Sequence, residues 1–194
     1  MKQYDNFLFA GSVKSLAVFI LAIFVFKCNG QTLDTIRWSP CYQLKYEDFQ
    51  NQPDSNSLDL ANSYIQISFT YQIVNNKLHY KVSCYFYKYL SWIKYNMPTL
   101  LSHEQGHFDI AKLFALKLEQ KFKEYRLATN VNDDLHSIYV SIVAERLAMD
   151  KLFDEKIKGA RNEIPQKEFI ANIRKQIPCC DKERGANKKL TSRL

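Results

Sequence analysis

Apolar and polar residues alternate along two neighbouring stretches in the first half of the chain. The first stretch places apolar side chains at every second position, at Ile65, Ile67, Phe69, Tyr71 and Ile73. The second does so from Leu78 to Phe86, and Asn75-Asn76 lies between the two. Period-two alternation on both sides of a two-residue asparagine turn predicts a β-hairpin.

The segments around this hairpin complete the predicted organisation. Residues 38–49 predict a strand followed by a turn, and the polar residues 51–62 predict an exposed loop. Three helices are then expected, over about residues 98–125, 135–158 and 162–177. Pro98 suits the first turn of the first helix, and Pro178 follows the last. Strands followed by helices predict an α+β domain rather than a parallel α/β fold.

The N-terminus has the features of an export signal. About a dozen apolar residues extend from Ser15 to Phe26, too short a stretch for a membrane anchor. Cys28 and Gly30 are small residues three places and one place before a cleavage site that would make Gln31 the first mature residue. A lipoprotein with acylated Cys28 is the alternative, although Lys27 stands where a small residue should precede that cysteine.

The net charge and the cysteine count bear on possible partners and on disulfide formation. The chain of 194 residues has a formal charge of +7, without a dense basic block beside stacking aromatics, so nucleic-acid binding is not favoured. After signal cleavage four cysteines remain, an even number that suggests disulfides outside the cytosol. We expect Cys41 to pair with Cys84, since both fall in the β-rich part. The adjacent Cys179 and Cys180 bond to each other only with strain.

The first predicted helix carries the residues with the clearest chemical pattern. His103 and His107 are four positions apart, so both imidazoles project from one helix face and can bind one metal ion. Glu104 stands beside the first histidine, where a carboxylate can act as a general base on water. This His-Glu-x-x-His spacing is the zincin arrangement and predicts a Zn²⁺ site. Core histidines bonded to neighbouring side chains are the alternative.

The surroundings of this motif on the helix support it. An inward stripe is expected, formed by Leu100, His103, His107, Ile110, Phe114 and Leu118. An outward face would carry Lys112, Lys117, Gln120 and Lys123. Gly106, in mid-helix, costs about 1 kcal/mol relative to alanine, which indicates that another group approaches the backbone closely there.

The stretch from His103 to Leu118 (HEQGHFDIAKLFALKL) resembles the HEQ-x-HFDI signature of a bacterial family of secreted zinc-dependent protease-like domains, whose function is formally unknown. The resemblance covers most of the chain after residue 30. Further matches are Leu44 to Phe49, with Tyr46 in place of a tryptophan, Ser91-Trp92, Phe153-Asp154, Asn162 and Gln166. The resemblance implies a zincin-like fold and peptide hydrolysis with Zn²⁺.

The third metal ligand departs from this family, which has a threonine and a histidine where this chain has Ile157 and Gly159. Glu145 is the first candidate, because it falls on a predicted apolar stripe, and Asp154 is the alternative. Asp109 is expected to pair with Lys112 or to support the site from outside the ligand shell. The other two histidines, His79 and His136, are expected to be exposed.

Together these features predict a signal peptide (residues 1–30), a zinc-metalloprotease-like domain (31–178) and a basic flexible tail (179–194). His103, His107 and Glu145 or Asp154 would bind Zn²⁺, and Glu104 would be the catalytic base of a secreted or periplasmic peptidase of the cell envelope. We expect neither a nucleic-acid partner nor a stable membrane span after signal cleavage. One alternative is a degenerate zincin-like protein that acts as a non-catalytic binding or scaffold module. Another is a protein that docks on a partner through its tyrosine-rich strands, with Tyr85, Tyr87 and Tyr89.

Overall fold

A computed structural model describes residues 34–157 and 163–178. The chain divides into two units, residues 1–31 and 32–194, and all described residues belong to the second. The predicted signal peptide and the basic tail lie outside the described residues, as do Gly159 and Asn162. Within the described part, no helix is long and apolar enough to cross a membrane.

The domain is α+β, as predicted, with a small antiparallel sheet and three helices. Strands β1 (Thr35–Arg37), β4 (Lys77–Tyr87) and β3 (Ile65–Val74) form a sheet in that spatial order. The short strands β2 (Ala61–Asn62) and β5 (Trp92–Ile93) form a separate antiparallel pair. Single 3₁₀ turns lie at Tyr46–Asp48 and Lys88–Leu90.

The hairpin between β3 and β4 confirms the prediction from residue alternation. Its register extends from Ile65 opposite Phe86 to Val74 opposite Lys77. Asn75 and Asn76 have positive φ values of 50° and 54°, the conformation that a type I′ hairpin turn requires at both central positions. The turn thus joins the two strands without an extra residue.

The strand expected between residues 38 and 49 is wrong, because the only strand of this region, β1, ends at Arg37. Side chains satisfy the backbone of the following segment. The Leu44 amide donates to Gln105 Oε1 at 2.8 Å, and the Lys45 amide donates to Asp48 Oδ2 at 2.9 Å. These side chains replace part of the backbone hydrogen bonding that a neighbouring strand would supply, while the Trp38 amide, just after β1, still donates to the carbonyl of Cys84 in β4 at 3.0 Å.

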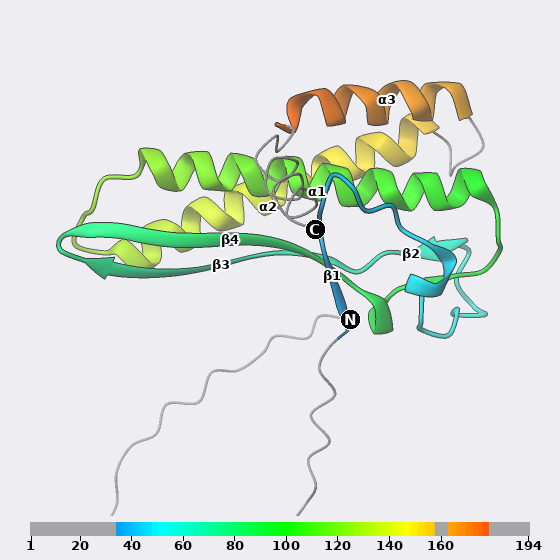
Figure 1. Cartoon of the computed structure of the whole chain (residues 1–194), viewed down its shortest axis with the longest axis horizontal. Coiled ribbons are helices and arrows are strands. Elements are labelled where there is room, and N and C mark those ends of the chain that lie inside the picture. Colours follow the sequence, from blue (N-terminus) through cyan, green and yellow to red (C-terminus); the bar gives the residue numbers. More distant parts are fainter. Residues whose placement is uncertain (1–33, 158–162, 179–194) are drawn as a thin grey trace, which may run out of the picture. The chain divides into compact units, whose positions relative to one another are not determined.

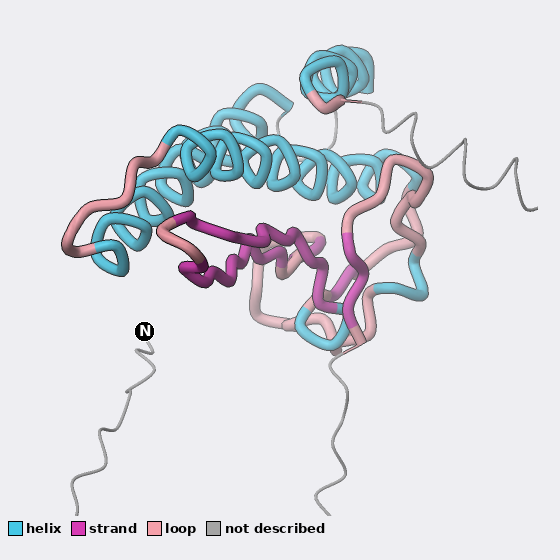
Figure 2. Tube along the Cα trace, turned by 60° about the vertical axis from the view of Figure 1, so that its left-hand side comes forward, coloured by secondary structure: helices cyan, strands magenta, loops and turns pink. Residues whose placement is uncertain are grey.

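The helices are α1 (Pro98–Glu124), α2 (Val131–Ile157) and α3 (Glu163–Gln176). Helix α1 contacts β3 and β4 on one side and both other helices elsewhere, so it lies in a middle layer between the sheet and α3 (Figures 1 and 2). This position explains why its burial exceeds the single predicted stripe. Phe108, Ala111, Ala115 and Phe122 are also at most 1% exposed. The core of the domain is therefore built around α1.

The predicted disulfide between Cys41 and Cys84 is wrong, because the two cysteines are not bonded to each other. Cys84 belongs to β4 and lies in the core, whereas Cys41 is exposed in the loop after β1. Burial raises the pKa of the Cys84 thiol to about 12, so this thiol stays protonated at neutral pH. Cys179 and Cys180 lie outside the described residues.

Candidate metal centre

The two histidines of α1 converge, as their four-residue spacing predicts. Their Nε2 atoms lie 3.1 Å apart, and the ring planes are nearly perpendicular, at 85°. His103 is only 5% exposed, while His107 is partly buried at the wall of a cleft. Both Nε2 atoms therefore face one shared point.

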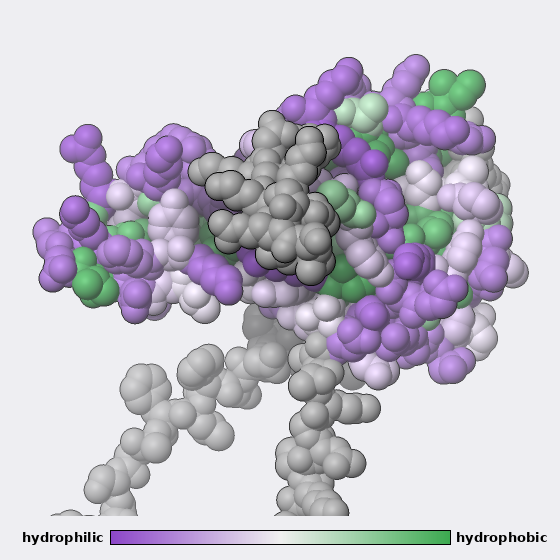
Figure 3. All heavy atoms as spheres, in the orientation of Figure 1, coloured by the Kyte–Doolittle hydropathy of each residue, from purple (hydrophilic) through white to green (hydrophobic). Residues whose placement is uncertain are grey.

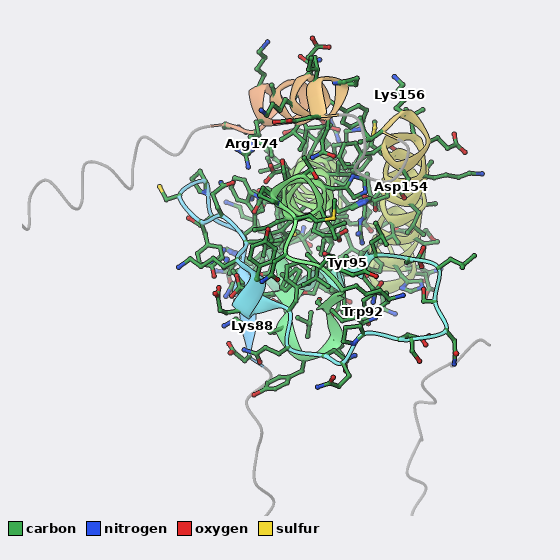
Figure 4. The ribbon with its side chains drawn as sticks, turned by 90° about the vertical axis from the view of Figure 1, so that its right-hand side faces the viewer. Lys88, Trp92, Tyr95, Asp154, Lys156 and Arg174 are labelled. Carbon is green, nitrogen blue, oxygen red and sulfur yellow. The ribbon has the colours of Figure 1, made fainter. Side chains whose placement is uncertain are left out.

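Asp154, from the last turns of α2 (labelled in Figure 4), completes a compact group with the two histidines. Its Oδ1 atom lies 3.0 Å from Nε2 of His103 and 3.0 Å from Nε2 of His107. Zinc holds nitrogen and oxygen ligands tetrahedrally at about 2.0–2.1 Å, which separates the ligand atoms by about 3.3 Å. The observed triangle is close to that size, so these three side chains fit a small divalent metal ion.

Glu145 is not part of this group, and the prediction that its side chain points into an apolar seam is wrong. The residue is exposed on α2 and does not line the cleft beside the histidines. The buried face of α2 carries Leu135, Ile142, Phe153 and Ile157 instead. Of the two carboxylates considered from the sequence, the fold brings Asp154 to the histidines.

Two further residues of α2 form a chain of polar contacts behind His107. The second ring nitrogen of His107, Nδ1, lies 3.0 Å from Asp150 Oδ1. Asp150 Oδ2 in turn forms an ion pair with Arg146 Nε at 2.8 Å, although that N–H is not directed along a hydrogen bond. Arg146 Nη1 donates to the carbonyl of Ile65 in β3 at 3.0 Å. This chain connects His107 to the edge of the sheet.

Proton affinity at the centre reflects its crowded charges. Partial burial raises the pKa of the Asp154 carboxyl, but its hydrogen bonds with His103 and His107 outweigh this and hold the pKa well below its usual range. Burial lowers the pKa of His107, yet the hydrogen bonds with Asp150 and Asp154 and the charge of Glu104 raise it to about 10. A proton and a metal ion therefore compete for Nε2 of His107.

Glu104 lies on the wall of an open cleft of about 550 Å³ that also exposes the two histidines and Asp154. Its Oε2 atom accepts a hydrogen bond of 2.6 Å from Ser63 Oγ. The segment that carries Ser63 is fixed by the fully buried Ser91, whose hydroxyl accepts from the Tyr64 amide at 2.9 Å. Ser91 thus holds the segment that places Ser63 beside Glu104.

Gly106 allows a close approach of α2, as its position in mid-helix predicted. A Cβ atom at this position would lie 2.7 Å from Phe153 Cζ and 3.2 Å from Ile170 Cδ1. The Phe153 ring stacks on His103, with centroids 4.7 Å apart and planes 12° apart, and meets the His107 ring edge-on. Glycine thereby lets one aromatic ring pack against both histidines.

The glutamine and aspartate of the same motif point away from the metal group. Asp109 is 1% exposed and accepts hydrogen bonds of 2.9 Å from Trp38 Nε1, 3.0 Å from Gln105 Nε2 and 2.6 Å from Arg174 Nε of α3. The predicted pairing of Asp109 with Lys112 is wrong, because the Lys112 ammonium lies over the Trp38 ring. Through these hydrogen bonds Asp109 connects α1 to Trp38, just after β1, and to Arg174 of α3.

Three residues near the group, Arg146, Asp150 and Ser63, were not predicted from the sequence. Arg146, Asp150 and Asp154 are spaced four residues apart, so they occupy successive turns on one side of α2, and this spacing was readable. No local pattern marks Ser63, whose contact with Glu104 joins residues 41 positions apart.

No family model, curated protein or solved structure matches the chain.

Proposed function

We propose that this protein is an exported zinc-dependent peptidase with a zincin-like active site. In this proposal His103, His107 and Asp154 hold the metal, and Glu104 is the general base. The observation that carries it is the triangle of Nε2, Nε2 and Oδ1 atoms, 3.0–3.1 Å apart, next to a carboxylate in an open cleft. Two neutral imidazoles and one carboxylate are a usual ligand set for catalytic zinc.

The division of work follows from where each side chain lies. When bound, the metal supplies a Lewis acid that polarises the carbonyl of the scissile bond. Glu104 accepts the proton of the attacking water and later delivers it to the leaving amine. Ser63 donates to Glu104 Oε2, which leaves Oε1 available for that proton. Leu58, which is 99% exposed, and Leu100 add apolar surface for a substrate side chain.

The degenerate-relative alternative was motivated by the missing family histidine. Asp154 supports the catalytic proposal instead, because it offers an oxygen at the third corner of the ligand triangle. Glu104, although only 5% exposed, also lines the wall of the cleft, so a peptide bound there would lie next to its carboxylate.

The partner-docking alternative has less support. Of Tyr85, Tyr87 and Tyr89 only the last is exposed, and the Tyr87 hydroxyl is engaged with Gln66 Oε1 at 2.7 Å. On the face of the molecule in Figure 3, hydrophobic side chains are scattered among polar ones rather than gathered in one patch. An aromatic docking surface would require a continuous exposed area.

The test combines metal analysis with peptide cleavage on the full-length protein. Zinc content is measured for the wild type, for Glu104→Gln and for Asp154→Ala, and cleavage is followed with a library of quenched fluorescent peptides. We expect one equivalent of zinc in the wild type and in Glu104→Gln. Cleavage by Glu104→Gln should fall by about 10²–10⁴-fold, the contribution of a general base. Asp154→Ala should lose both zinc and cleavage.

Glu145→Gln is the matched control, since it changes the same side-chain chemistry at an exposed site on α2. It should retain full zinc content and activity. A wild type that binds no zinc would refute the metal site. Equal cleavage by the wild type and Glu104→Gln would refute the role of Glu104.

A further inference from the structure

The two ring nitrogens of His107 face different groups, and the ligand triangle accounts for only one of them. His107 points Nε2 toward His103 and Asp154, and Nδ1 toward Asp150. A histidine can bind a metal through either nitrogen, and the partner of the other nitrogen decides which one is free. A carboxylate can only accept, so Asp150 requires a proton on Nδ1 and leaves the lone pair on Nε2.

We propose that Asp150 is a positioning residue that selects Nε2 of His107 for the metal, and that Arg146 holds Asp150 in place. This inference rests on the proposed metal site. Asp150 is not itself a ligand, because it faces Nδ1, on the side of the ring away from the ligand triangle. Carboxylates that orient a metal-bound histidine contribute about 10–100-fold to metal affinity.

Arg146 extends the support from the helix to the sheet. Its side chain is 14% exposed and spans from Asp150 Oδ2 to the carbonyl of Ile65. Ile65 lies two residues after Ser63, which contacts Glu104. One short segment, residues 63–65, therefore contacts both the proposed base Glu104 and Arg146, which holds Asp150 in place. Among the described residues His103 has no comparable partner, because its Nδ1 is buried without a hydrogen bond to any of them.

The experiment measures zinc affinity rather than catalysis. Full-length wild type, Asp150→Asn, Asp150→Ala and Arg146→Met are titrated with zinc against a competing chelator, and folding is checked by circular dichroism with and without EDTA. We expect Asp150→Ala to weaken zinc binding by 10–100-fold. Asp150→Asn should lose less, because the amide oxygen can still accept from Nδ1. Glu145 is exposed and precedes Arg146 in the sequence, so Glu145→Ala should bind zinc as tightly as the wild type does.

A double mutant separates the two residues. If Arg146 acts through Asp150, Arg146→Met should weaken zinc binding in the wild type but have no further effect in the Asp150→Ala background. Equal losses in both backgrounds would overturn this part of the proposal. If Asp150 were a direct ligand, Asp150→Asn would be as damaging as Asp154→Ala, and that result would overturn the positioning role.

The zinc-bound wild type provides a measurement that does not depend on whether variants fold. The ¹⁵N shifts of His107 should show a protonated Nδ1 and a metal-bound Nε2. The reverse assignment overturns the proposal. A wild type that binds zinc but whose affinity is unaffected by Asp150→Ala refutes only the positioning role. A wild type that binds no zinc refutes the proposed function as well.

Discussion

Replacing Gly106 with alanine tests how tightly α2 is packed against the motif helix. The new methyl carbon would lie 2.7 Å from Cζ and 2.8 Å from Cε1 of Phe153, closer than carbon atoms approach in proteins. The ring cannot move aside cheaply, because it is completely buried and stacked on His103. Overpacking of this kind costs about 1–3 kcal/mol. Alanine recovers about 1 kcal/mol of helix propensity, so we expect a net loss of about 1 kcal/mol.

The assay is urea unfolding at 25 °C in EDTA, followed by zinc titration of the folded variant. Because the displaced ring contacts both histidines, Gly106→Ala should also weaken zinc binding. Phe153→Leu shortens the obstructing side chain, and the double mutant should be more stable than the sum of the two single losses predicts. If Gly106→Ala is as stable as the wild type or more stable, the packing argument is refuted.

Three further predictions follow from other contacts. Asp109→Ala removes the acceptor of three hydrogen bonds and should cost about 3 kcal/mol in urea unfolding, while the zinc stoichiometry stays at one. Tyr46→Phe removes a buried hydroxyl that has no hydrogen-bond partner in the part of the chain that the structure describes, so thermal unfolding should show unchanged stability or a gain of up to about 1 kcal/mol; a clear loss would contradict this. Zinc affinity should rise about tenfold per pH unit above neutrality as His107 loses its proton, and should level off near its pKa of about 10; a flat profile would contradict the competition. In the absence of zinc, the free energy of unfolding should instead fall as the pH rises. Protonated His107 stabilises the fold fully below its ordinary pKa of 6.5, and this contribution is lost as the pH rises through its folded-state pKa of about 10.

The features that the sequence predicted well are those that depend on local geometry. The hairpin required only residue alternation and two residues that tolerate positive φ, and both properties belong to the segment itself. The convergence of His103 and His107 follows from the helix period alone. Gly106 indicated a close approach to the helix, although the sequence did not identify Phe153 as the neighbour.

The sequence named Glu145 and Asp154 as candidates for the third ligand but could not decide between them, because the choice depends on how α2 is rotated about its axis. The stripe that placed Glu145 inward differs from the observed buried face by roughly 70°, less than the 100° step of one helical residue. Both stripes contain Ile142, so the apolar pattern alone could not separate them. Packing against α1 decides the rotation, and it brings Asp150 and Asp154 to the histidines.

The enclosure of α1 on several sides has a consequence for how relatives of this chain diverge. One edge of the helix carries the candidate metal group, the opposite edge carries Gln105 and Asp109, and most other buried positions pack against the sheet or the neighbouring helices. Exposed positions gather near its end, at Gln120, Lys121, Lys123 and Glu124. Substitutions along the buried part of α1 should therefore seldom be neutral, whereas the exposed hairpin tip and residues 51–56 can vary more freely. Distant homologues will therefore share a recognisable helix inside an otherwise dissimilar sequence.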